Sequence, residues 1–135
     1  MTAQERALEI VNHCKIGMFG NNDEQGNPQI KAMLKTKNEG LSVFWFCSNT
    51  SSKRVAQLLK DGNACIYFHE GFNGVMLSGT AEVSYDDDIR KSFWEDFMYR
   101  YYPLGALDPD FALIKFTAKY GNLYDGLPTK DFEVD

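Results

Sequence analysis

A run of small polar residues followed by two cations is the most informative feature of the sequence. The run Ser48–Ser52 (SNTSS) follows an apolar segment, and Lys53 and Arg54 come directly after it, where a helix is predicted to begin. Hydroxyl groups and unpaired backbone N–H groups at a helix start attract anions. Cations there oppose the helix macrodipole, at a cost of roughly a few tenths of a kcal/mol each. A bound phosphate explains this pattern, and so does an ordinary N-cap with solvated cations.

Two further lysines belong to a neighbouring predicted strand. Lys31 and Lys35 are four residues apart, so they share one face of that strand. Both are candidates to point toward the same anion. The alternative is a solvated outward face, and this alternative is favoured more for Lys35 than for Lys31.

The cysteines and histidines give weaker signals. Cys14, Cys47 and Cys65 cannot all pair within one chain, and there is no CxxC motif, so we expect reduced thiols in a cytosolic protein. Cys47 adjoins the polar run, which suggests either a thiol of lowered pKa or, as the favoured interpretation, a packed thiol. His13 and His69 lie far apart with no nearby carboxylate or thiol pattern, so no metal site is expected.

Length, composition and charge exclude several classes of protein. The 135 residues, 44% hydrophobic and 24% charged, are typical of one globular domain, which we expect to span 1–135. A net charge of −5 argues against nonspecific binding to nucleic acids or anionic membranes. We find no signal-peptide pattern and no apolar window of about 18 residues, and we expect a cytoplasmic protein. The absence of GxSxG, GxxxxGKS/T and GxGxxG motifs argues against the common hydrolase, triphosphatase and Rossmann folds.

Hydrophobic periodicity and turn residues predict about seven strands and three helices. A capping box at Thr2 and Glu5 opens a helix over 2–14, and Gly62 ends a second helix over 52–60. A third helix follows Asp86 and carries Ile89, Phe93, Trp94, Phe97 and Met98 inward. Strands are predicted at 16–21, 29–37, 41–47, 64–70, 75–84, 111–118 and 120–125, and a loose polar tail after Gly126.

Most predicted strands are joined by links of hairpin length. Such links favour antiparallel pairing over a parallel sheet with crossover helices. The predicted fold is therefore mainly β with peripheral helices, in the form of a small barrel or a strongly curled sheet.

The order of several segments resembles a known superfamily. QIKAML, VFWFCSN, SSKRVAQLL, ACIYFHE and VMLSGTAEV follow one another as in the pyridoxamine 5'-phosphate oxidase-like FMN-binding split-barrel superfamily. The later portion, SFWEDFMYRYYPLGALDPDFALIKFTAKYGNLYDG, is similar to its general stress protein branch. The resemblance covers about residues 5–126, and its specificity lies in the order and spacing of the segments.

This resemblance implies a homodimeric split β-barrel with two FMN sites at the subunit interface. It implies that the FMN phosphate is held by Lys31, Ser52, Lys53 and Arg54. It places the isoalloxazine edge near Met33, Cys47, Ser48 and Asn49. Across the interface it places Gly74, Val75, Met76 and Trp94, with Tyr124 as a further ring contact.

Two departures from the family pattern bear on function. Lys31 stands where the family usually has Arg, and Lys cannot offer a planar bidentate fork to a phosphate. The chain also ends in the acidic sequence YDGLPTKDFEVD, whereas true pyridoxamine phosphate oxidases have a longer C-terminal portion with basic residues. We therefore do not expect pyridoxamine phosphate as the substrate.

The leading hypothesis is an FMN-dependent oxidoreductase whose substrate is a small molecule or a reduced nicotinamide. In such enzymes the flavin carries the electrons and the protein supplies placement and electrostatics. One alternative is a dimeric, stress-related flavin-binding scaffold without catalysis. Another is a deazaflavin-dependent reductase, which is less favoured because the cluster at the helix start suits the short phosphate tail of FMN.

Overall fold

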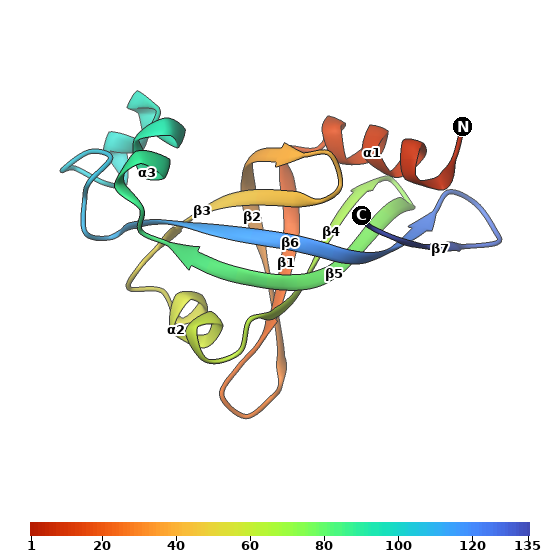
Figure 1. Ribbon diagram of the computed structural model, residues 1–135, viewed down its shortest axis with the longest axis horizontal. Helices are drawn as coiled ribbons and strands as arrows, with labels where there is room; N and C mark the ends of the chain where they lie inside the picture. Colours follow the sequence, from red (N-terminus) through yellow and green to blue (C-terminus); the bar gives the residue numbers. More distant parts are fainter.

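Six antiparallel strands close into a barrel, and a seventh strand extends one edge (Figure 1). The computed structural model describes all residues, 1–135. The sheet order is β3-β2-β1-β4-β5-β6-β7, and an additional pairing of β3 with β6 closes the barrel. The strands are β1 (Ile16–Asn22), β2 (Pro28–Glu39), β3 (Val43–Asn49), β4 (Asn63–Glu70), β5 (Asn73–Ser84), β6 (Phe111–Tyr124) and β7 (Lys130–Glu133). This architecture confirms the predicted split β-barrel with peripheral helices.

The helices lie around the barrel. They are α1 (Ala3–His13), α2 (Lys53–Lys60), α3 (Asp87–Phe93) and the 3-10 helix η1 (Asp96–Arg100). In Figure 1, α1 lies above the barrel and α2 lies below it, next to the turn between β1 and β2. The predicted capping box of α1 is present, because the Thr2 and Glu5 side chains each accept a bond from the other residue's backbone N–H. None of the helices has the length and apolar character needed to cross a bilayer.

Alternation along β3 produces two separate apolar clusters. Phe44 and Phe46 point into the barrel core, whereas Trp45 points outward into a second cluster. That second cluster is formed by Trp45, Met98, Tyr102, Phe111 and Leu113. It binds the segment 87–110 to the outer face of β3 and β6, and thereby holds that segment beside the polar run at the end of β3.

The prediction of one helix continuing to Met98 is wrong. α3 ends at Phe93, and Trp94 has an extended backbone with φ −70° and ψ 135°. Phe93 packs against Trp45 and Trp94 packs against Phe111, with ring centroids 5.2 and 5.4 Å apart. With the extended backbone at Trp94, both rings pack against the second cluster on the outer face of β3 and β6. Phe97, expected to face inward, is 53% exposed.

The C-terminal part also differs from expectation. The two strands predicted at 111–118 and 120–125 form one strand, β6, because it pairs along its length with β3 and β5. The tail is not loose, since its residues form β7 against β6. The Phe132 ring is buried over Gly121, where a side chain would collide with it.

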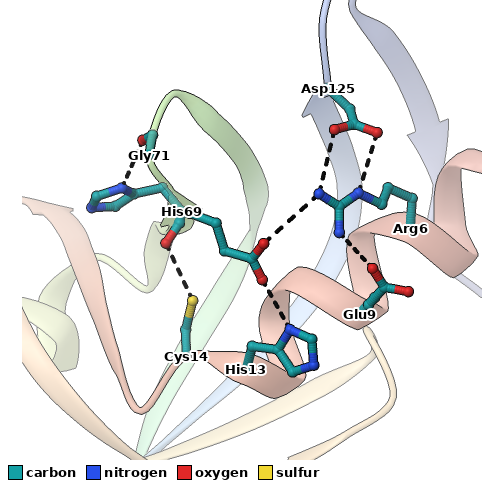
Figure 2. A network of polar contacts seen from close by, with 8 residues as sticks. Arg6, Glu9, His13, Cys14, His69, Gly71 and Asp125 are labelled. Atoms are coloured by element: carbon teal, nitrogen blue, oxygen red, sulfur yellow. Dashed lines mark hydrogen bonds and ion pairs between the residues drawn. The ribbon is translucent and has the colours of Figure 1, made fainter.

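A network around Arg6 fastens α1 to the barrel (Figure 2). The Arg6 guanidinium pairs with Glu9 at 2.6 Å, Asp125 at 3.2 Å and Glu70 at 3.8 Å. His13 Nδ1 lies 3.0 Å from the other carboxylate oxygen of Glu70. One helix is thus tied to the ends of β4 and β6.

Candidate functional site

A cavity of about 390 Å³ lies between the start of α2 and the β1–β2 hairpin. Four of its lining residues are those predicted to hold a phosphate, namely Lys31, Ser52, Lys53 and Arg54. The others are Phe19, Asn21, Gln29, Ile30 and Gln57. The structure therefore brings together, from β2 and α2, three of the four cations that the sequence singled out.

The start of α2 is held firmly against the hairpin. Ser52 is its N-cap, and its Oγ accepts a bond from the Val55 N–H at 3.2 Å. The backbone N–H groups of Lys53 and Arg54, in the first turn, have no acceptor within the helix. Asn21 Nδ2 donates to Gln57 Oε1 at 2.9 Å in a buried bond, which fixes α2 relative to β1.

The cavity carries positive charge without a counter-charge from the protein. None of the ion pairs involves Lys31, Lys53 or Arg54, and the first turn of α2 has no acidic residue. Burial lowers the pKa of the Arg54 guanidinium, because its charged form has lost part of its hydration. In a chain of net charge −5, such a group of unpaired cations is a site suited to an anionic ligand.

Lys35 does not belong to this cavity. It shares the inner face of β2 with Lys31, but four residues of strand separate the two by about 13 Å. Lys35 Nζ donates to the Val11 carbonyl at 2.8 Å, at the C-terminal end of α1. The prediction that both lysines could face one anion is wrong, because Met33, buried in the core, stands between them.

Beyond the cavity, β2 and β3 separate. Residues 28–34 of β2 pair with β1, but the ladder between β2 and β3 begins only at Lys35 and Phe46. At this end, residues 47–49 of β3 pair with β6 alone. The facing edges of the two strands therefore carry backbone groups without ladder partners, which can bind the polar edge of a planar ligand.

A second, larger groove continues along the same strand. It has a volume of about 700 Å³ and lies between the end of β2 and the segment that joins α3 to η1. Leu34 and Lys37 line it from β2, and Phe93, Trp94 and Phe97 line it from the other side. Trp94 thus belongs to this groove and not to the cavity, and its buried Nε1 donor has no acceptor.

The polar run between β3 and α2 is shaped by a single carboxylate. Asp110 Oδ1 accepts bonds from the Thr50 hydroxyl and the Ser51 N–H, both at 3.0 Å. The Thr50 N–H donates to the Asp110 carbonyl at 2.9 Å. These hydrogen bonds hold the pKa of the Asp110 carboxyl below its usual value. Two N–H groups of the run are therefore already engaged, and the groups left for an anion are those at the start of α2.

Cys47, Ser48 and Asn49 line neither the cavity nor the groove. Burial raises the pKa of Cys47 to about 12, so the favoured interpretation of a packed thiol is confirmed. Ser48 is buried, with its Oγ 3.4 Å from that of Ser52. Asn49 is exposed, and its Oδ1 accepts a 2.6 Å bond from the Tyr102 hydroxyl.

The remaining predicted contacts are not brought to the cavity within one chain. Met33 and Val75 have their side chains in the barrel core. Gly74 and Tyr124 pair with each other where β6 ends, whereas Phe111, at the start of β6, pairs with Asn49 beside the polar run. The contacts of Gly74, Val75, Met76 and Tyr124 stay predictions for a second copy of the chain, and that of Met33 stays a prediction for the isoalloxazine edge.

The sequence reasoning missed three polar residues of the cavity, Asn21, Gln29 and Gln57. Gln57 carried a usable signal, because it lies three and four residues after Arg54 and Lys53 and so shares their helical face. Asn21 and Gln29 had no such sequence signal, because the pairing of β1 with β2 brings them to the cavity. The structure contains no group of three or more His, Cys, Asp or Glu side chains placed to hold a metal ion.

Comparisons with known proteins agree with this fold. The family model described as pyridoxamine 5'-phosphate oxidase like matches residues 2–130. A Clostridium acetobutylicum protein related to general stress protein 26 of B. subtilis is 39% identical, with a TM-score of 0.89 over 99% of this chain and 97% of its own. General stress protein 26 from Bacillus anthracis is 18% identical, with a TM-score of 0.82 over 99% of this chain and 100% of its own. A heme binding protein from Mycobacterium smegmatis, also 18% identical, has a TM-score of 0.79 over 98% of this chain and 58% of its own. The search of curated proteins gave no match.

Proposed function

The chain belongs to the pyridoxamine 5'-phosphate oxidase-like family, and from this premise we propose that it binds FMN in the α2 cavity and acts as an oxidoreductase. One observation carries the proposal above the others. Lys31, Lys53 and Arg54 line one cavity and have no carboxylate partner. A phosphomonoester with about two negative charges is the complementary ligand.

Each part of the site has its own task in this proposal. Ser52, with the N–H groups at the start of α2, donates hydrogen bonds to the phosphate, and the three cations neutralise it. The open edges of β2 and β3 bind the polar edge of the isoalloxazine. When bound, FMN supplies hydride and single-electron transfer, so the protein needs no nucleophile of its own.

The groove beside Trp94 is the proposed place of the substrate. It follows the cavity and the open strand edges along β2, and its wall combines aromatic rings with Lys37. Such a lining suits a planar organic molecule. A turnover assay with reduced nicotinamides tests whether this molecule is the nicotinamide itself.

Heme, the ligand named for one structural neighbour, fits the cavity less well. Heme iron is held by an axial His, Cys, Met or Tyr side chain. The lining of the cavity includes none of these four residue types. Both histidines lie elsewhere, His13 beside Glu70 and His69 bonded to the Gly71 carbonyl.

We also propose that two copies of the chain form the complete site. Ile16, Met18, Ile30 and Leu34 are exposed on the outer face of β1 and β2, and Ile16 pairs directly with Leu34. An exposed apolar face of this kind indicates a protein partner. A second copy docked there would supply the predicted contacts from Gly74, Met76 and Tyr124.

The three free cysteines suit a reducing compartment, and we propose that the dimer works in the cytoplasm.

The chromophore of the purified protein tests the assignment. We expect a flavin absorption spectrum, and a released molecule with the mass of FMN after heating. A colourless protein that takes up no FMN on reconstitution would contradict the proposal. A heme spectrum would identify heme as the cofactor instead of FMN, and the mass of a deazaflavin would identify a deazaflavin.

A turnover assay separates an enzyme from a flavin-binding scaffold. The FMN-loaded protein is mixed with NADH or NADPH in air, and the loss of reduced nicotinamide is followed. Steady oxidation beyond one equivalent supports an oxidoreductase. Stoichiometric FMN with no reduction by any donor supports the stress-related scaffold.

A further inference from the structure

We propose that Asp110 is a positioning residue that shapes the phosphate end of the cavity without touching it, an inference that rests on the FMN function proposed above. Asp110 is not among the residues that line the cavity. It lies in the loop before β6 and contacts the polar run at Thr50 and Ser51. Its hydrogen bonds are with Thr50 and Ser51, which precede α2, and with Asp108 of its own loop.

The contacts of Asp110 fix the course of the polar run. Its carboxylate binds the hydroxyl of Thr50 and the N–H of Ser51, and its carbonyl binds the N–H of Thr50. The next residue, Ser52, donates its N–H to the Asn49 carbonyl at 3.0 Å and caps α2 with its side chain. Every backbone N–H from Thr50 to Ser52 is thus satisfied in one conformation, and that conformation sets where α2 starts.

Asp110 is itself held by buried groups. Its N–H donates to Asp108 Oδ1 at 2.9 Å, and Asp108 is only 6% exposed. The Arg90 guanidinium, 8% exposed, donates to the carbonyls of Asp108 and Phe111 at 3.2 Å. Tyr102 adds a 2.6 Å bond to Asn49 from the same loop. These hydrogen bonds fix the loop before β6, and the loop in turn fixes the conformation of residues 50–52.

Loss of the Asp110 carboxylate should change the conformation of residues 50–52 and leave β3 and α2, on either side of them, in place. β3 remains paired with β6 up to Asn49, and α2 remains bonded to β1 through Gln57 and Asn21. Between β3 and α2, the N–H of Ser51 and the hydroxyl of Thr50 would donate their hydrogen bonds to water instead. Ser52 and Lys53 would then lose their common orientation toward the phosphate, whereas the rest of the flavin site would not change.

The test compares FMN with riboflavin, which lacks the phosphate, by equilibrium titration of apoprotein. Asp110→Ala should weaken FMN binding about tenfold and riboflavin binding less than about twofold. Asp110→Asn keeps an acceptor oxygen for both donors, so its FMN affinity should stay within about threefold of the wild type. The matched control is Asp131→Ala, which removes a carboxylate bonded to Asn122 at 2.7 Å on β7 and should change neither affinity. If Asp110→Ala does not fold, Thr50→Val removes one donor with little change of shape and should weaken FMN binding about threefold, with riboflavin unaffected.

The outcomes distinguish this inference from the function on which it rests. Wild-type protein that binds no flavin contradicts the proposed function. Wild-type protein that prefers FMN, with Asp110→Ala equal to it, overturns only the positioning role. An equal loss of FMN and riboflavin affinity, or an Asp110→Asn variant as weak as Asp110→Ala, also overturns it, because the effect would then be general or would depend on charge.

Discussion

At the scale of single residues, the site depends on cations that the protein leaves without partners. Lys31, Lys53 and Arg54 line the same cavity, and Arg54 has also lost part of its hydration. Such an arrangement is unfavourable in the empty protein, because like charges stand together and one of them is half-buried. A dianionic phosphate bound there would relieve both effects, so the proposed site would let a chain of net charge −5 hold an anion.

Removing a cation from the start of α2 should weaken FMN binding. Each of Lys53→Ala and Arg54→Ala should lose about 1.5–3 kcal/mol, or about ten- to a hundredfold in affinity, because a charge-assisted bond to phosphate is lost. Titration of the apoproteins measures this loss, and circular dichroism checks that the variants fold. Lys60→Ala, in the last turn of the same helix, is the control and should bind normally. Unchanged FMN affinity in both variants would show that the phosphate does not bind in this cavity.

The substitution Lys31→Arg should act in the opposite direction. Arg offers a planar fork that binds two phosphate oxygens at once, whereas Lys offers one compact charge. We expect FMN to bind about three- to tenfold more tightly to the Lys31→Arg variant, with riboflavin affinity unchanged. Weaker binding of FMN would show that Lys31 does not face the phosphate.

Asp110 should give the protein an acid-dependent component of stability. Its pKa is lowered in the folded protein, so its ionised form stabilises the fold at pH values above the usual carboxyl pKa of about 4. This contribution is lost as the pH falls through the lowered folded value. Thermal unfolding of wild type and Asp110→Asn should therefore differ most at neutral pH and converge in acid. A difference that grows as the pH falls would contradict this.

At the scale of elements, β2 connects the whole candidate site. It contributes Lys31 to the cavity, an open edge facing β3, and Leu34 and Lys37 to the groove. α2 supplies the other wall of the cavity, and the buried bond between Asn21 and Gln57 holds these two parts together. α1 lies at the other side of the barrel from the cavity (Figure 1), so the cavity and the body of this helix are separate, and only the C-terminal end of α1 reaches the groove, through Asn12.

The Arg6 network provides a test of this separation (Figure 2). Arg6→Met keeps the aliphatic stem but removes the pairs with Glu9, Glu70 and Asp125. Amide hydrogen exchange in α1 should become faster, because the helix is less firmly attached, and FMN affinity should not change. Gln4→Met, on the same helix, is the control. Unchanged exchange in α1 would show that the network does not hold the helix.

Patterns local in sequence predicted more of this structure than patterns that depend on packing. The capping box of α1, the start of α2 and the positions of β1 to β5 along the chain follow from neighbouring residues, and they were predicted. The break after Phe93 follows from two aromatic contacts across the fold, with Trp45 and Phe111. The place of Lys35 follows from the bond to Val11 on a separate helix. The roles of Asn21 and Asp110 depend equally on distant partners, so periodicity could not reveal them.

At the scale of the whole molecule, the outer face of β1 and β2 exposes a group of apolar side chains, which is the basis of the proposed dimer. It exposes Ile16 by 62% and Met18 by 37%, with Leu34 and Ile30 beside them on β2. Within one chain, Gly74 and Tyr124 pair far from the cavity end of β6. A dimer would explain the exposed apolar side chains and would bring the contacts predicted from a second copy to the cavity.

Charge placed on that face should separate the copies. Light scattering should give a mass of twice 15.4 kDa for the wild type and 15.4 kDa for the Ile16→Asp and Met18→Asp double variant. The monomer should also retain less FMN, because its site would lack the partner's contacts. Leu104→Asp, at another exposed apolar position, should remain dimeric. A wild-type monomer would contradict the dimer and every contact attributed to a partner.

The most direct test of the central claim is a parallel calorimetric titration of FMN and riboflavin into the wild-type apoprotein and the Lys53→Ala and Arg54→Ala double variant. We predict that the wild type binds FMN at least about tenfold more tightly than riboflavin, and that this preference largely disappears in the double variant. Equal affinity of the wild type for both ligands, or an undiminished preference for FMN in the double variant, would contradict a phosphate site at the start of α2.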